Sequence, residues 1–533
     1  MDNVFAKNSP KIKNCERSGY SFYFDLISLL WEKRTNEGAI HRLCSLMRKM
    51  GAKTLINEEL EPDAEILQEF QDLEKRIGEK LIQSTAIRIS FFSCSNNQDW
   101  RNFPKSAFLG YAVILKIKFS KGDLSYILES VTRPPGWVKE DTYFQTTNYY
   151  IHCHKTFKTI IGTKEQHEKY SVDGAFFCQQ NGLTHVCAHA ALRTMLNTVD
   201  GLVNHKVTNS ELNNILIAAY PKDFPTGFAS NGMKPCHMEK IAASFGLNTH
   251  AANLLEMPTV DYAEWIYPFV ESGFPVLLAF CPTHQMGHVV AVLGHTMNSD
   301  KWDCEAHLAY RPEALGKHIA SSAWVDHFII NDDNFGMYSC MPPSYLRNKT
   351  LPQYDITQRA TYALTLLPLN TDVPPYFAEK PSMVIISNLS QSYTPQKDNK
   401  WLIRLWEQHG SKGIVARTVI CKRDAYIESI KTYLPIGYVI PSTIINCSED
   451  IILTEISLPD LYTCNKHKIG DIISDSKGGI SNGNKFVQFI WGWLPGIQFI
   501  QSPVNPITPI AWPIKKHIPL LRHPNTLNPF QEW

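Results

Sequence analysis

The chain has 533 residues, 44% of them hydrophobic and 19% charged, and its formal net charge is +1. This length is too great for one hydrophobic core, because domains of roughly 100–200 residues predict about three of them. The balanced charge argues against a broad surface for nucleic acid or for an acidic membrane, so we expect no nucleic-acid partner.

No run of about 18 apolar residues is present, so the sequence predicts no membrane span. The first residues lack the apolar core of a signal peptide. Thirteen cysteines, an odd number without a Cys-x-x-Cys pair, indicate reduced thiols. We therefore expect a cytoplasmic protein, with export as an effector by a non-classical route left open. The Ile-, Asn- and Lys-rich composition favours a bacterial source.

Residues 1–165 are expected to form an N-terminal α+β region, either a unit of its own or an elaboration packed on the catalytic domain. Apolar residues recur at three- and four-residue spacing over about 20–85, which predicts mainly helix. The period then changes, and residues 87–91 and 112–119 are typical of strands.

Residues 166–365 have a different order, with helices first and strands second. Helices are predicted at 188–197, 239–245 and 263–272, and strands at 276–280, 288–293 and 328–331. Helices followed by an antiparallel sheet are an α+β layout, which is the fold class that we expect.

The proline-rich segment 366–382 predicts a linker between domains. Beyond it, residues 383–533 are expected to form a β-rich domain whose proline-rich tail lies over the surface. The predicted strands of this domain are 383–386, 414–416, 418–420, 451–453 and 486–490.

A candidate nucleophile, Cys187, lies where a loop turns into the predicted helix at 188–197. Thr184 is the expected N-cap, which places the thiol in the first helical turn. A helix N-terminus and an adjacent imidazolium both favour the thiolate, which is the reactive form of cysteine. Gln180, or less favourably Gln179, could donate an amide N–H to a developing oxyanion, alongside the Cys187 backbone N–H.

The base must come from elsewhere in the chain, and His288 is preferred because it opens an apolar strand directly after Gly287. His284 and His295 are its rivals. His185 and His189 flank the thiol, but side chains so spaced on a helix diverge, and we expect both to line the cleft.

Asp332 ends the strand predicted at 328–331, where its carboxylate could orient the imidazole. Asn331 is the main rival for this role. In a regular strand, alternate side chains point to opposite faces, so Asn331 and Asp333 are expected to face away from His288.

These residues together resemble the papain-like cysteine peptidase superfamily, most closely its bacteriocin-processing (C39-type) and C39-like branch. The resemblance covers about 166–345 and rests on Gln180, 187–192, 287–290 and 329–332 with Gly336. It implies a papain-like catalytic domain with a helical half and an antiparallel sheet. The chain departs from the family in having Cys-Ala for Cys-Gly, Asp-Asp for Asp-Pro, and one extra residue between Gln and Cys.

The expected function is a cysteine peptidase or thiol hydrolase that cleaves an amide or isopeptide bond in a protein or peptide. Cys187 would form the acyl-enzyme, His288 would move the proton, Asp332 would orient His288, and Gln180 would assist the oxyanion. No cofactor and no metal are predicted. A transglutaminase-like acyl transferase with the same triad and a non-catalytic binding module that retains the fold are the alternatives.

Overall fold

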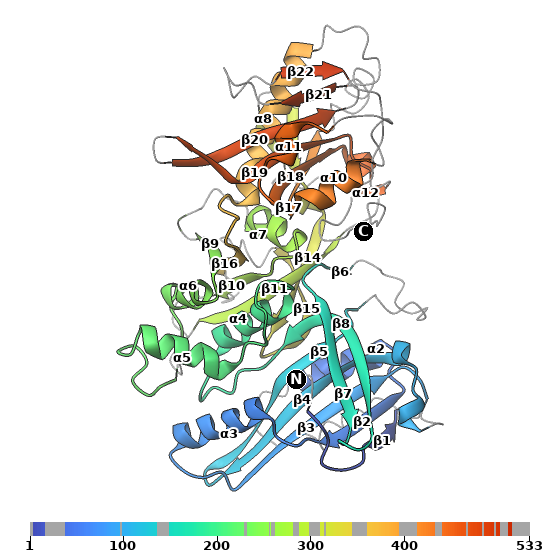
Figure 1. Ribbon diagram of the computed structural model, residues 1–533, viewed down its shortest axis with the longest axis vertical. Coiled ribbons are helices and arrows are strands. Elements are labelled where there is room, and N and C mark those ends of the chain that lie inside the picture. The colour runs from blue at the N-terminus through green and yellow to red at the C-terminus, as the bar shows by residue number, and fades with distance from the viewer. Residues whose placement is uncertain are drawn as a thin grey trace, which may run out of the picture. The chain divides into compact units, whose positions relative to one another are not determined.

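The structure is a computed structural model that describes residues 4–15, 38–95, 99–135, 149–228, 232–254, 256, 262–280, 287–297, 310–313, 316–343, 360–393, 413–431, 440–464, 467–481, 484–494, 497–500 and 510–513. The chain forms two compact units. Unit 1 comprises Met1–Asn253, Pro275–Gly294 and Phe328–Leu366, and unit 2 comprises Leu254–Phe274, His295–His327 and Leu367–Trp533. Helices and largely antiparallel sheets confirm the α+β class (Figure 1).

The N-terminal part of unit 1 is built on a seven-stranded antiparallel sheet in the order β1-β2-β3-β4-β5-β8-β7. Its strands are β1 (Lys11–Asn14), β2 (Thr54–Glu59), β3 (Gln83–Phe92), β4 (Phe108–Phe119), β5 (Gly122–Thr132), β7 (Lys155–Gly162) and β8 (His167–Phe177). The strands predicted at 87–91 and 112–119 lie within β3 and β4, which confirms them.

Two helices, α2 (Gly38–Lys49) and α3 (Ala64–Ile77), occur in the region predicted to be mainly helical. The first part of that region lies outside the described residues, and β2 interrupts the rest because it pairs with β1 and β3. In α3, Asp63 caps the first turn by accepting from the Ile66 N–H at 2.9 Å, and Gly78 ends the helix with φ 81°.

A second sheet has the strand order β15-β14-β11-β10-β16-β9, and β6 (Tyr149–Ile151) pairs with β11. Its strands are β9 (Leu247–Asn253), β10 (Val276–Phe280), β11 (His288–Met297), β14 (Val325–Asp332), β15 (Gly336–Met341) and β16 (Ala360–Pro368). The helices α4 (Cys187–Thr198), α5 (Asn209–Ala219) and α6 (Pro235–Ser244) precede these strands in the chain. The predicted order of helices first and strands second holds only in part, because β8 precedes α4 and β9 precedes α7 (Tyr262–Glu271).

Unit 2 contains α7 (Tyr262–Glu271) and an eight-stranded sheet in the order β12-β13-β17-β18-β19-β20-β21-β22. The strands are β12 (Tyr310–Glu313), β13 (Gly316–Ala320), β17 (Ile414–Lys422), β18 (Asp450–Ser457), β19 (Gly470–Ser481), β20 (Asn484–Leu494), β21 (Ile497–Ile500) and β22 (Ile510–Pro513). Four helices accompany them: α8 (Pro375–Tyr393), α10 (Arg423–Lys431), α11 (Ser442–Ile445) and α12 (Pro459–Cys464).

Two expectations around the linker are wrong. The strand predicted at 383–386 and the last part of the linker, residues 375–382, both lie in the helix α8. A short apolar run does not distinguish a strand from a buried helical segment, and a proline in the first helical turn costs the helix nothing. Residues 1–165 and 166–253 both belong to unit 1, which leaves the N-terminal region as either a unit of its own or an elaboration of the catalytic domain.

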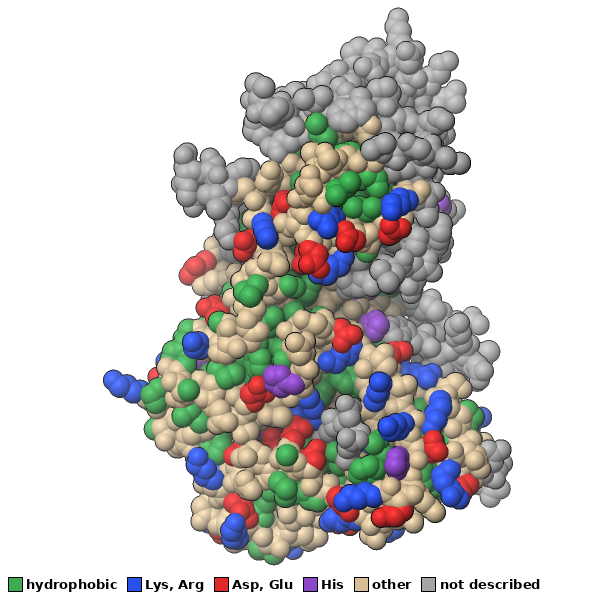
Figure 2. Space-filling model, viewed as in Figure 1, with side chains coloured by type: hydrophobic (Ala, Val, Ile, Leu, Met, Phe, Trp, Pro, Cys, Tyr) green, Lys and Arg blue, Asp and Glu red, His purple; other side chains and the backbone are tan. Residues whose placement is uncertain are grey.

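The charges follow the balance that the sequence indicates. On the face shown in Figure 2, Lys and Arg side chains alternate with Asp and Glu over unit 1, and no single-sign patch dominates it. No helix in the described part of the chain is long and apolar enough to cross a membrane.

Candidate active site

The candidate nucleophile, Cys187, is the first residue of α4. The helix begins at Cys187, one residue before the predicted range 188–197, and its N-cap is Val186, in an extended conformation, and not Thr184. Thr184 is held earlier in the loop, where its hydroxyl accepts a hydrogen bond from the side chain of Asn181 at 2.8 Å. The Cys187 side chain is partly exposed, so a substrate can reach it.

The loop before Cys187 is fixed by Asn181 and Gln179. Asn181 Oδ1 accepts from the N–H groups of Leu183 and Thr184, both at 2.9 Å, which is an Asx-type turn. Gln179 Nε2 donates to the carbonyl of Asp333 at 3.1 Å. Gln179 therefore has a structural role, and it is not available for an oxyanion.

His185 and His189 do not line a cleft, contrary to expectation, because both side chains are fully buried. His185 Nδ1 accepts from the Asn181 N–H at 3.4 Å, and its Nε2 lies 3.6 Å from Glu69. His189 Nε2 bonds to Asn213 Oδ1 at 3.1 Å. Burial and the nearby His185 lower the pKa of His189 to about 3, so it stays neutral and structural.

His288 is the first residue of β11 and meets both other members of the predicted triad. Its Nε2 lies 3.1 Å from Asp332 Oδ2, and the Cys187 thiol is close enough to the ring to raise the pKa of the imidazole. Burial alone would lower the pKa of His288. Contacts with Asp332 and Cys187, together with the negative charges of Asp332 and Asp333, outweigh burial and raise this pKa to about 10.

Asp332 is oriented by the turn that follows it. Its Oδ1 accepts from the N–H groups of Asn334 at 2.8 Å and Phe335 at 3.3 Å, which leaves Oδ2 facing His288. Asn331 points away from the imidazole, as strand alternation predicts. It binds the carbonyl of Phe176 at 3.0 Å and accepts from the Tyr338 N–H at 3.1 Å.

The expectation that Asp333 faces away from His288 is wrong. Its Oδ1 lies 3.9 Å from His288 Nε2, because β14 ends at Asp332 and a turn replaces the strand alternation. Burial raises the pKa of the Asp333 carboxyl to about 7, while His288 lowers it and Asp332 raises it further.

Gln180 lies in the same loop as the thiol and is half-buried. Its backbone N–H approaches the Asp333 carboxylate. Its side chain makes no hydrogen bond with another described residue, so nothing holds the amide toward Cys187. The structure thus brings together Cys187, His288 and Asp332, and leaves the side chain of Gln180 unfixed.

Sequence reasoning missed one neighbour of the imidazole besides Asp333. Asn334 Nδ2 lies 3.4 Å from His288 Nδ1. The run of Asp and Asn before Gly336 is a turn signal that could have indicated that the strand ends at Asp332.

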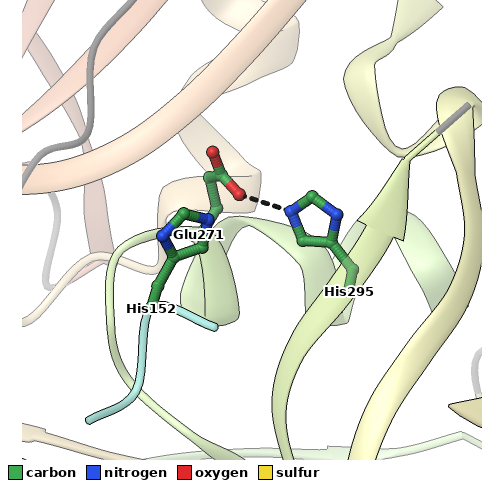
Figure 3. Close-up of side chains that lie close together, drawn as sticks. All are labelled: His152, Glu271 and His295. Atoms are coloured by element: carbon green, nitrogen blue, oxygen red, sulfur yellow. Dashed lines mark hydrogen bonds and ion pairs between the residues drawn. The ribbon is translucent and has the colours of Figure 1, made fainter. Parts of the chain in front are cut away.

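Of the rival histidines, His284 lies outside the described residues. His295 is fully buried in unit 2, where its Nε2 bonds to the Glu271 carboxylate at 2.7 Å (Figure 3). Glu271 also accepts two hydrogen bonds from Arg417, at 3.0 and 2.6 Å. His295 is therefore engaged in a buried charge network.

The hairpin that carries Asp332 is clamped by α2. Arg42 donates to the carbonyls of Met337 at 3.2 Å and Tyr338 at 2.6 Å. Gly336 has φ 102°, and a Cβ there would lie 2.7 Å from the Arg42 Cβ. Tyr338 has φ 50°, a strained conformation for a residue with a side chain. The N-terminal helix is thus part of the scaffold of the site.

Chemically, the arrangement offers a thiol at a helix start, an imidazole that contacts it, and a carboxylate that orients the imidazole. The chain matches no protein-family model and no curated protein.

Proposed function

We propose that this protein is a cysteine peptidase, or a closely related thiol hydrolase, whose catalytic part has a papain-like architecture. One observation carries the proposal: the His288 ring contacts the Cys187 thiol and the Asp332 carboxylate at once. A nucleophile, a base within hydrogen-bond reach and a third group that orients the base are the requirements for covalent catalysis by a thiol. The substrate is a protein or a peptide.

The proposed reaction starts from the thiolate and the protonated imidazole. The thiolate attacks the carbonyl carbon of the amide, and the C=O electron pair moves onto oxygen. Backbone N–H groups at the start of α4 have no intrahelical partner, so the N–H of Cys187 can stabilise this oxyanion. His288 then protonates the leaving amine, and the C–N bond breaks to give a thioester with Cys187.

In the second half of the reaction, neutral His288 removes a proton from water, and the hydroxide attacks the thioester. The thiolate leaves, the acid product dissociates, and His288 holds the proton again. Asp332 keeps the ring oriented and stabilises its charged form in both halves. The reaction needs no cofactor.

The papain-like architecture is supported by the elements on which the three candidate catalytic side chains lie. The helix α4 presents the thiol, and the adjacent strands β11 and β14 of an antiparallel sheet present the base and the carboxylate. This chain differs from the family pattern at three positions: Ala188 and Asp333 replace the usual residues, and the side chain of Gln180 is not fixed.

The first test is site-mapped alkylation with limiting iodoacetamide near pH ~6, where an ordinary thiol is almost fully protonated. We expect Cys187 to react at least about ten-fold faster than Cys236, and His288→Ala to abolish the advantage. Cys236 is an internal control, because it is exposed in the first turn of α6 and no described imidazole bonds to its thiol. Equal rates for the two thiols in the wild type would contradict the proposal.

A second test identifies the reaction. The wild type and Cys187→Ala are incubated with a peptide library, with and without an added primary amine, and products are identified by mass spectrometry. New carboxyl ends that depend on Cys187 support hydrolysis. Amine adducts in place of carboxyl ends would assign acyl transfer to the same triad.

A further inference from the structure

Asp333 is the least satisfied charged group in the site. Its side chain is 2% exposed, and no hydrogen bond of normal geometry from another described residue reaches either carboxylate oxygen, although the Gln180 N–H approaches it. A buried carboxylate without partners is costly, and native proteins rarely keep one. It lies beside a second carboxylate, Asp332, so that two negative charges share one imidazole.

The side chains of His288, Asp332 and Asp333 are close enough together to bind one metal ion. One atom from each, His288 Nε2, Asp332 Oδ2 and Asp333 Oδ1, lies within 4.8 Å of the others. The nitrogen is 3.1 Å from the first oxygen and 3.9 Å from the second. Tetrahedral ligands with bonds of about 2.0–2.2 Å lie about 3.3–3.5 Å apart, a value between these two distances.

We propose that His288, Asp332 and Asp333 form a binding site for one divalent transition-metal ion such as Zn²⁺, with a fourth position open to water. One imidazole nitrogen and two carboxylates suit such an ion, and they cancel its charge. One supporting contact is present: Asp332 Oδ1 is held by the backbone N–H groups of Asn334 and Phe335.

Metal binding and the proposed peptidase chemistry exclude each other. A metal on Nε2 uses that lone pair, so the neutral ring carries its proton on Nδ1 and cannot accept another from the thiol. The ion would therefore hold the enzyme in an inactive state. This consequence rests on the proposed function, whereas the metal site itself does not, because none of its ligands is Cys187.

The test titrates chelator-treated protein with Co²⁺, followed by absorbance, and with Zn²⁺, followed by calorimetry. Wild type, Cys187→Ser and Asp326→Asn are each expected to bind one ion, without a sulfur-to-cobalt charge-transfer band. Asp326 is a matched control, because it is an exposed Asp on the same strand, β14. Asp333→Asn is expected to weaken binding at least about ten-fold, because a carboxamide is a poor ligand.

The site is overturned if Asp333→Asn binds as tightly as wild type, or if the wild type shows no Co²⁺ spectrum. A charge-transfer band that disappears in Cys187→Ser also overturns it, since the ion would then be on sulfur. If circular dichroism shows that Asp333→Asn does not fold, His288→Gln takes its place and must lose the same binding. Alkylation of Cys187 in chelator tests the proposed function separately, and saturating Zn²⁺ is expected to slow it at least about ten-fold.

Discussion

The side chain of Gln179 joins the loop that leads to Cys187 to the turn that follows Asp332. Its Nε2 donates to the Asp333 carbonyl at 3.1 Å, and its Oε1 accepts from the Ile127 N–H on β5 at 3.0 Å. One buried amide thereby fixes two segments that are distant in sequence. The placement of the nucleophile relative to the carboxylates depends on this link as well as on α4.

Replacement of Gln179 by Ala is expected to destabilise the protein and to lower the reactivity of the Cys187 thiol. The change leaves a buried N–H and a buried C=O unpaired, which costs about 2–4 kcal/mol. Urea unfolding measures the loss, and limiting iodoacetamide measures the reactivity of Cys187. Gln180→Ala is the control for stability, because that side chain makes no hydrogen bond with another described residue. Equal unfolding free energies for the two variants would show that the link contributes nothing.

Arg42→Ala is expected to loosen the hairpin that carries Asp332. Two hydrogen bonds from a charged donor are lost, and Tyr338 with φ 50° loses one of its restraints, so we expect a loss of about 2–3 kcal/mol. Because Asp332 is then less well placed, alkylation of Cys187 near pH ~6 should slow. Lys49→Ala, on the exposed end of the same helix, is the control. If the Arg42→Ala protein is destabilised but its Cys187 is alkylated at the wild-type rate, α2 contributes to stability and not to the arrangement of the site.

The elements that carry the site could be predicted because each has a local signal. Good helix formers follow Cys187, and apolar runs follow His288 and precede Asp332. Strand alternation correctly placed Asn331 away from the imidazole. The sequence pattern therefore indicated the helix and the two strands that carry the candidate site, and the candidate residue on each of them.

What could not be predicted depends on contacts between distant segments. The position of Asp333 follows from a turn whose carbonyl is held by Gln179, and no local pattern encodes that bond. Thr184 is not the N-cap that the sequence predicts, because its N–H and its hydroxyl both form hydrogen bonds with the Asn181 side chain inside the loop. The apolar run at 383–386 lies in a helix, where Ile385 and Ile386 are buried and Val384 is exposed, and only this packing distinguishes the run from a strand.

Gly336→Ala is expected to be more damaging than a change at another glycine with positive φ. At Gly336 the added Cβ meets the Arg42 Cβ at 2.7 Å, whereas at Gly51, with φ 78°, it meets nothing within 4 Å. We expect about 1–2 kcal/mol for Gly51→Ala from backbone strain alone, and at least about 1 kcal/mol more for Gly336→Ala. Thermal unfolding of both variants gives the difference. A difference near zero would mean that α2 shifts to accommodate the added methyl group without a loss of stability.

The pH dependence of stability provides a test of the scaffold behind the nucleophile loop. Burial would raise the pKa of Glu69, but its contact with His185, with help from Arg193 and Tyr126, lowers it to about 2. The folded protein thus binds the proton of Glu69 less readily than the unfolded chain. Its stabilising effect is full above about pH 4.5 and is lost as the pH falls toward about 2.

Glu69→Gln should therefore lose the acid sensitivity together with the stabilisation. We expect the variant to be less stable than wild type by about 3 kcal/mol at pH 7, with the difference shrinking steadily below about pH 4.5. Urea unfolding at a series of pH values measures both effects. Glu59→Gln is the control, since its exposed ion pair with Lys7 is screened by solvent. A difference between wild type and Glu69→Gln that stays constant with pH would show that the loss comes from packing and not from the charge of Glu69.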